Sequence, residues 1–318
     1  IMNDRFGSYP YPQFSVIQGG DGGMEYPMCT MISGSGSFGG LVSVTVHEAI
    51  HNWFYGVLAT NETKYPWMDE GFTKFAQDIV LDSLFERGKL NPHKRSYDTY
   101  IRNAIKGNDE PLSTPADHYE TNEDYAVNAY YKGCVFLNQL SGIVGQKNFD
   151  RGMKAYFNQW KYKHPTPREF KRIMEKTSGL ELDWYFDAWI GTTKTIDYGI
   201  RYVAANNGKS VVELERIGSM PMPLELLVVS GGENHIYYIP LQAMQGAKSA
   251  PESWGANWHE QKAWPWTYPY YQITLDVPME KIERIRIDPF EKLGDIDEKN
   301  DAYPTAILSF PGGDANTN

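Results

Sequence analysis

The stretch that decides the fold is VSVTVHEAIHNWFYGVL, residues 42–58, and its centre is His47-Glu48-Ala49-Ile50-His51. The apolar residues around this centre predict a helix. On that helix His47 and His51, four positions apart, lie on one face and can bind one metal ion. Glu48 follows the first histidine, where it can reach a water on the ion rather than the ion itself. The alternative interpretation is a buried histidine pair with a structural ion pair.

A third candidate ligand favours the metal site. Glu70 lies in WMDEGF, residues 67–72, and eighteen residues separate it from His51. A loop over 59–66 would let a second helix fold back on the first and bring this carboxylate to the histidines. Two histidines and one glutamate leave a fourth position for water, which is the arrangement of catalytic zinc. We therefore expect one zinc ion as the cofactor.

Three motifs together resemble a known family. HEAIH at 47–51, the eighteen-residue gap and DEGF at 69–72 are similar to the aminopeptidase N (alanyl aminopeptidase) family of gluzincin zinc metallopeptidases. GGMEY at 22–26 resembles that family's Gly-Ala-Met-Glu-Asn exopeptidase signature, and YYKG at 130–133 resembles its Tyr-x-Lys-Gly segment. With the motifs in the family's order, the chain is similar to a bacterial member that lacks its N-terminal region.

The resemblance implies the catalytic roles. His47, His51 and Glu70 would hold zinc, and Glu48 would be the general base for the zinc-bound water. Tyr130 would donate a hydrogen bond to the oxyanion of the tetrahedral intermediate. The next residue is also a tyrosine, but on a helix it points about 100° away. The spacing to the Lys-Gly pair selects Tyr130.

The resemblance also implies the substrate-binding residues. Glu25 would bind the free α-ammonium group of a peptide by a charge-assisted bond, which places the first peptide bond at the metal. The backbone at Gly22 and Gly23 would pair with the peptide as an added strand. The expected partners are peptides with a free N-terminus. The alternative for Glu25 is a solvated glutamate at a strand edge.

Three positions depart from the family pattern. Tyr26 replaces the Asn of the signature, and Asp69 replaces the usual Asn before the third ligand. Gln77 stands where the family commonly has a glutamate that supports the metal ligands. A neutral amide would tune the basicity of a ligand less than a carboxylate does.

The two halves of the chain differ in their periodicity. A helical period predicts helices at 43–58, 67–87, 93–107, 124–143, 147–161, 168–177 and 182–190. Short β-branched or aromatic runs predict strands at 28–32, 200–203, 210–214, 224–229, 236–241, 271–275 and 282–287. The expected fold class is α+β and multidomain. A partial thermolysin-like, mainly helical zinc-peptidase domain over 1–192 precedes an all-β, immunoglobulin-like sandwich over 193–303 and a flexible tail over 304–318.

Composition excludes several classes of protein. The 318 residues carry a net charge of −10 without a basic block, which argues against a nucleic-acid partner. No apolar run has the length of a transmembrane segment. The two cysteines, Cys29 and Cys134, cannot form a disulfide framework. The chain begins at Ile1 without a signal peptide. We therefore expect a piece of a longer protein whose N-terminal domain is on the full-length chain.

The remaining motifs are interpreted as structural. GSGSFG at 34–39 fits a dinucleotide-binding pattern, but the helix after it carries the metal ligands, so a flexible loop is expected. The aromatic stretch 254–271 is interpreted as an insertion packed on the sandwich, with a sugar-binding or partner-binding patch as the alternative. His93, like the other histidines outside the motif, has no ligand partner at a useful spacing. Cys29 and Cys134 are expected to be small buried hydrophobic residues.

The favoured function is zinc-dependent hydrolysis of the N-terminal peptide bond of peptides. The first alternative is an endopeptidase or another gluzincin hydrolase. The second is a truncated, zinc-containing peptide-binding module without turnover, which the missing N-terminal region favours. By resemblance to exported bacterial relatives, a periplasmic or secreted location is favoured.

Overall fold

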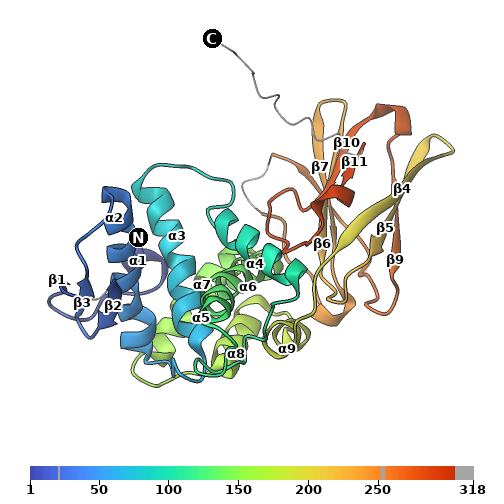
Figure 1. The fold of residues 1–318 in the computed structure, drawn as a ribbon. Helices are drawn as coiled ribbons and strands as arrows, with labels where there is room; N and C mark the ends of the chain where they lie inside the picture. Colours follow the sequence, from blue (N-terminus) through green and yellow to red (C-terminus); the bar gives the residue numbers. More distant parts are fainter. Residues whose placement is uncertain (21, 252–254, 305–318) are drawn as a thin grey trace, which may run out of the picture.

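The structure is a computed structural model that describes residues 1–20, 22–251 and 255–304 (Figure 1). Helices predominate up to Gly191 and strands from Tyr198 onward, so the protein belongs to the α+β class. Residue 254, where the aromatic stretch starts, and residues 305–318 of the expected tail lie outside the described residues. Among the described helices, none combines the length and the apolar character needed to cross a membrane.

A small sheet lies beside the helix that carries the histidines (Figure 1). Its strands are β1 (Ser15–Gln18), β2 (Gly23–Tyr26) and β3 (Cys29–Ile32), in the order β1-β3-β2. β1 pairs parallel with β3, and β2 pairs antiparallel with it. β2 is therefore an edge strand of this sheet. β3 confirms the strand expected at 28–32.

The helices lie close to their predicted positions, with π-helical turns at η1, η2 and η3. In chain order they are α1 (Met2–Arg5), α2 (Phe38–His51), η1 (Asn52–Leu58), η2 (Trp67–Gly71), α3 (Phe72–Leu84), α4 (Lys94–Lys106), α5 (Asn122–Tyr125), η3 (Ala126–Lys132), α6 (Gly133–Val144), α7 (Gln146–Trp160), α8 (Pro167–Ser178) and α9 (Asp183–Gly191). α2 begins earlier than predicted because Ser37 caps it by accepting a hydrogen bond from the Gly40 N–H. The second part of GSGSFG is thus helix rather than loop.

Local signals and apolar packing fix the helices around the motifs. At α8, Thr166 and Glu169 form a capping box, and Gly179 ends the helix with a φ of 76°. Phe72, two residues after the third candidate ligand, is buried and packs edge-to-face on Phe170 of α8, with 4.9 Å between the ring centroids. The start of α3 is therefore anchored in the core of the helical region.

Two sheets form the C-terminal region. One has the order β11-β10-β6-β7-β8 and the other the order β4-β5-β9. The strands are β4 (Tyr198–Asn206), β5 (Lys209–Arg216), β6 (Leu224–Ser230), β7 (Glu233–Ile239), β8 (Asn257–Glu260), β9 (Tyr270–Leu275), β10 (Ile282–Ile287) and β11 (Ala302–Tyr303), with short 3-10 turns η4 (Gln242–Met244), η5 (Met279–Lys281) and η6 (Glu298–Asn300). Each of the six strands expected here overlaps an observed strand. β8, which the pattern does not predict, comes from the aromatic stretch and pairs parallel with β7.

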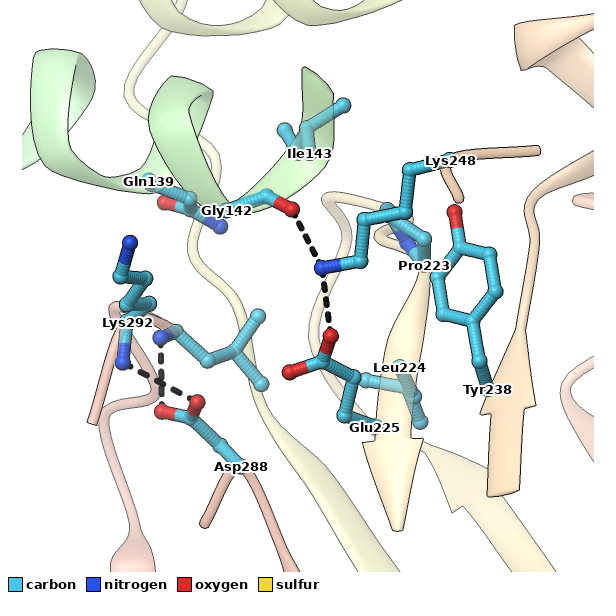
Figure 2. A pocket seen from close by; sticks show the side chains of 11 residues that line it. Gln139, Gly142, Ile143, Pro223, Leu224, Glu225, Tyr238, Lys248, Asp288 and Lys292 are labelled. Atoms are coloured by element: carbon cyan, nitrogen blue, oxygen red, sulfur yellow. Dashed lines mark hydrogen bonds and ion pairs between the residues drawn. The ribbon is translucent and has the colours of Figure 1, made fainter. Parts of the chain in front are cut away.

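A buried charged contact joins the helical region to the larger sheet (Figure 2). The Lys248 ammonium donates to the carbonyl of Gly142 in α6 and forms an ion pair with Glu225 of β6. Nearby, the carboxylate of Asp288 accepts the backbone N–H groups of residues 292 and 293, at 3.0 and 2.7 Å. Partners of this kind offset the cost of burying charge. The contact holds the larger sheet against the end of α6.

Candidate metal and catalytic site

Three candidate ligands converge at one point. His47 and His51 of α2 and Glu70 of η2 have ligand atoms that all lie within 4.8 Å of one another. The two histidine Nε2 atoms are 3.1 Å apart, and Glu70 Oε2 lies 3.2 Å from the first and 3.3 Å from the second. Two imidazole nitrogens and one carboxylate oxygen at this spacing can hold one ion, and the donor set suits zinc.

The site forms where the helices widen into π-helical turns. His51 is the last residue of α2 before η1, Glu70 lies within η2 and Tyr130 lies within η3. A π-helical turn changes the direction in which the following side chains point, and such turns are frequent at functional sites. The sequence pattern, read with a period of 3.6 residues, finds the right helices but not these turns.

The glycines of two motifs lie in direct backbone contact. A Cβ atom on Gly71 would lie 2.8 Å from the Cα atom of Gly133, and a Cβ atom on Gly133 would lie 2.9 Å from the Cα atom of Gly71. Only residues without a side chain allow η2 and the start of α6 to approach this closely. The buried Lys132 anchors the second motif by donating to Asp109 Oδ2 at 2.8 Å and to the Glu110 carbonyl at 2.6 Å. The glycine contact thus explains why each motif contains a glycine.

This contact brings Tyr130 to the candidate ligands. Its hydroxyl donates to Glu70 Oε1 at 2.7 Å, and its ring stacks on that of His47 with 5.6 Å between the centroids. Burial and the neighbouring Glu70 carboxylate raise the pKa of Tyr130, so the hydroxyl keeps its proton as a donor. Tyr131 points elsewhere, with Lys74 over its ring. Of the two neighbouring tyrosines, Tyr130 is therefore the one beside the candidate ligands.

Asp69 is a functional candidate that the sequence analysis missed. Its Oδ1 atom lies 2.6 Å from His51 Nδ1 in a buried contact. When Nδ1–H donates to this carboxylate, Nε2 keeps its lone pair for a metal ion. The expected supporting position, Gln77, instead donates to the Ser43 carbonyl and hydroxyl at 2.8 and 3.1 Å. The available signal for Asp69 was an acidic residue directly before the third ligand.

Glu48 has the environment of a proton-transfer group. It is 6% exposed, and burial raises its pKa to about 7, against the opposing effect of His51 and with added repulsion from Glu25 and Glu70. Its Oε2 atom is buried and has no hydrogen-bond partner among the described residues. A carboxyl group with a near-neutral pKa can both take up and return a proton. The unpartnered oxygen also suits a site built to receive another molecule.

The edge strand β2 brings Glu25 to the same place. Ligand atoms of Glu25, Glu48 and His51 all lie within 4.8 Å of one another. A Cβ atom on Gly23 would lie 2.6 Å from Glu48 Oε1, so this glycine makes room for the carboxylate. Gly22 directly precedes the strand. The site residues expected from the sequence thus lie on α2, η2, η3 or β2, except Gly22, which directly precedes β2.

Sequence spacing offers no ligand partner for His93, but the fold supplies two. His93 Nδ1 lies 3.2 Å from Asp78 Oδ2 and 3.4 Å from Cys134 Sγ. His235 and His259, on neighbouring strands, also approach to 3.1 Å. In both cases the partners are distant in the chain, so their spacing in the sequence carries no signal.

The fold and the site define an α+β protein with a His-His-Glu centre and a carboxylate beside it. Residues 22–189 match the Peptidase family M1 domain. This match covers more than half of the 318 residues. The chain therefore belongs to peptidase family M1, and the family expected from the motifs is confirmed.

Similar proteins agree with this membership. The probable aminopeptidase 2 of Sulfurisphaera tokodaii is 25% identical over 210 residues, which cover 63% of this chain and 25% of that protein. Aminopeptidase B of Mus musculus is 27% identical over 192 residues, which cover 54% of this chain and 29% of that protein. The chain thus spans between a quarter and a third of these relatives. Aminopeptidase A of Legionella pneumophila, solved with aspartic acid, shares the fold at 11% identity and a TM-score of 0.55, over 88% of this chain and 31% of that one.

Proposed function

We propose that this chain is the catalytic part of a zinc-dependent aminopeptidase, which hydrolyses the N-terminal peptide bond of peptides. The observation that carries the proposal is the meeting of the His47, His51 and Glu70 ligand atoms with the unpartnered carboxylate oxygen of Glu48. The names of the relatives, aminopeptidases in each case, support the reaction. The fold likeness to the Legionella protein over most of the chain supports a common architecture.

The architecture belongs to the proposal. The helical region, residues 1–192, would be a partial thermolysin-like catalytic domain, and residues 193–303 would be an immunoglobulin-like β-sandwich. The change from helices to strands between Gly191 and Tyr198 supports this division. The two separate sheets after it support a sandwich.

The residues present fit zinc. His47, His51 and Glu70 would hold the ion, because their ligand atoms face one another at 3.1–3.3 Å. Asp69 would fix the tautomer of His51 through Nδ1. When bound, zinc supplies Lewis-acid polarisation of the scissile carbonyl and makes water more acidic.

The chain's own residues then carry the protons and the charge. Glu48 takes a proton from the attacking water at its free oxygen and passes it to the leaving amine. Burial raises the pKa of Glu48, which favours the uptake of that proton. Tyr130, whose hydroxyl already lies beside the Glu70 carboxylate at 2.7 Å, donates to the oxyanion as it forms.

The restriction to the N-terminal bond rests on Glu25. Its carboxylate lies next to Glu48, where it can bind a substrate α-ammonium group by a charge-assisted bond. β2 is an edge strand, so its outer backbone groups can pair with a peptide that runs along it. Gly22 and Gly23 at the start of the strand let the peptide backbone come close.

The test compares an alanyl anilide with its N-acetyl-alanyl counterpart, using the zinc-loaded chain and its Glu25→Gln variant. We expect the wild-type chain to cleave only the free-amine substrate. We expect Glu25→Gln to lower kcat/KM on that substrate by about 10–100-fold, the value of one charged hydrogen bond. The acetylated substrate lacks the ammonium group, so it shows whether cleavage by the wild-type chain depends on that group.

Two outcomes would overturn the proposal. Cleavage of both substrates at similar rates would indicate an endopeptidase or another hydrolase of the same class. Peptide binding by a zinc-loaded chain that cleaves neither substrate would indicate a binding module without turnover.

A further inference from the structure

A second cluster of metal-binding side chains lies in the helical region, outside the candidate catalytic site. Asp78 of α3, His93 directly before α4 and Cys134 of α6 have ligand atoms that all lie within 4.8 Å of one another. His93 is 2% exposed and Cys134 is fully buried. The three residues come from three different elements, so their meeting is a product of the tertiary fold.

The distances within this cluster match those around a zinc ion. Sγ–Nδ1, Sγ–Oδ2 and Nδ1–Oδ2 are 3.4, 3.7 and 3.2 Å. Zinc bonds of about 2.3 Å to sulfur and about 2.0–2.1 Å to nitrogen and oxygen in a tetrahedron put the ligand atoms about 3.3–3.6 Å apart. The catalytic cluster has edges of 3.1–3.3 Å between smaller atoms. The distances between candidate ligand atoms are thus similar in the two clusters, and those to sulfur in the second cluster are longer because sulfur is larger.

As hydrogen bonds, the contacts of Asp78 with nitrogen and oxygen donors are long, whereas the contacts of the Cys134 sulfur have ordinary lengths. Oδ2 of Asp78 is approached by three donors at once, His93 Nδ1, Ser96 Oγ and Cys134 Sγ, at 3.2, 3.3 and 3.7 Å. Ordinary N–H···O and O–H···O bonds centre near about 2.9 and about 2.8 Å. Two loose donors and a thiol around one carboxylate oxygen are compatible with a single ion that bonds to the oxygen, the nitrogen and the sulfur together.

The surroundings hold the candidate ligands in position. Lys74 forms an ion pair with the other carboxylate oxygen, Oδ1, and so leaves Oδ2 directed at the cluster. The ring of Phe75 stacks on that of His93, with 4.6 Å between the centroids. Partners of this kind orient metal ligands in proteins.

One of the three candidate ligands, His93, also borders a cavity. A cavity of about 170 Å³ is lined by His93 together with Phe75, Asn91 and Asn138. It is large enough for several waters, one of which can supply the fourth ligand of a tetrahedral ion.

We propose that Asp78, His93 and Cys134 form a second zinc site, structural in role and independent of the catalytic one. Binding replaces the thiol proton of Cys134, which is released to solvent, by a sulfur–zinc bond. The ion would tie α3, which follows directly from the turn that carries Glu70, to α6, which follows directly from the turn that carries Tyr130. It would thereby stabilise the packing that holds these two residues together.

Cobalt(II) in place of zinc tests this site without any reference to activity. A cobalt–thiolate bond gives a near-ultraviolet charge-transfer band, and the catalytic ligands contain no sulfur. We expect the wild-type chain to bind two equivalents of cobalt and to show the band. One equivalent and no band in the wild-type chain would overturn the proposal.

Three variants identify the residue whose sulfur gives rise to the band. Cys29→Ser alters the other cysteine, which is partly exposed, and should keep both the band and the two equivalents. Cys134→Ser should lose the band and one equivalent. His47→Ala should lose one equivalent but keep the band, which separates this site from the proposed catalytic centre. Loss of the band in Cys29→Ser would overturn the assignment of the band to Cys134. This comparison remains available if Cys134→Ser does not fold.

Discussion

The helical region and the β-rich region both bury carboxylates, but they surround them differently. In the helical region, Glu48 and Glu70 lie among histidine, tyrosine and other carboxylate side chains from separate elements. In the β-rich region, Asp288 and Asp295 accept hydrogen bonds from backbone N–H groups. The donors to Asp295 are the N–H groups of Tyr198 and Asp297, at 2.8 and 2.9 Å. A carboxylate that caps the backbone fixes the path of the chain. One that faces other titratable side chains is available for chemistry.

The largest effect expected from this difference is that of Glu48→Gln. The amide keeps the shape of the side chain but cannot accept a proton, so kcat should fall by roughly 10²–10⁴-fold. Zinc content should stay close to wild type, because Glu48 is not one of the three candidate ligands. The free energy of unfolding should not fall, because the change removes the charge of a buried carboxylate that has an unpartnered oxygen. Anilide hydrolysis, metal analysis and urea unfolding would measure the three quantities.

A matched change in the β-rich region provides the control. Asp295→Asn should leave hydrolysis within about twofold of wild type and alter only the free energy of unfolding. Full residual activity in Glu48→Gln would contradict the proposed mechanism. A large loss of activity in Asp295→Asn would contradict the separation of the two regions.

A smaller effect is expected for Tyr130→Phe. Removal of one oxyanion donor should lower kcat by about 10²–10³-fold, with a smaller change in KM. Tyr131→Phe removes the same hydroxyl group one position along the helix, from a ring that lies beneath Lys74. It should keep nearly all the activity. Equal losses in the two variants would show that the ring packing of η3 matters rather than the hydroxyl of Tyr130.

The candidate catalytic site could be predicted from the sequence because its information is local. His47 and His51 are one helical turn apart, and Glu70 follows in the next helix. Their meeting needs only a helix, a loop and a second helix that folds back. The strands of the β-rich region were found for a similar reason, since a short β-branched or aromatic run such as that at 224–229 is a local signal.

What the sequence could not show depends on contacts between distant segments. His93 meets Cys134 across forty-one positions, and no spacing rule connects them. The close approach of Gly71 and Gly133 is equally non-local, although it explains why each motif contains a glycine. The π-helical turns were missed because they depart from the period used to find the helices.

The smallest of these effects, and the one that tests the β-rich side of the comparison, concerns Asp301. Burial and repulsion from Asp295 and Asp288 raise its pKa to about 9, and its Oδ1 atom has no hydrogen-bond partner among the described residues. A carboxyl group whose pKa is raised by folding favours the folded state at low pH, and this stability is lost as the pH rises from about 4 towards 9. Asp301→Asn removes the ionisation, so it should stabilise the protein at pH 8 by about 1–3 kcal/mol and much less at pH 4.

Urea unfolding of Asp301→Asn at the two pH values measures this difference, with the exposed Asp187→Asn as the control for the chemical change itself. Asp187→Asn should show no pH-dependent gain. Hydrolysis by both variants should equal that of the wild-type chain, because neither residue belongs to the candidate catalytic site. An equal gain at both pH values would mean that Asp301 is ionised to the same extent in the folded and unfolded states. The burial of Asp301 among acids would then be offset by contacts other than those seen around it. The β-rich side of the comparison would then consist only of Asp288 and Asp295, which accept backbone N–H groups.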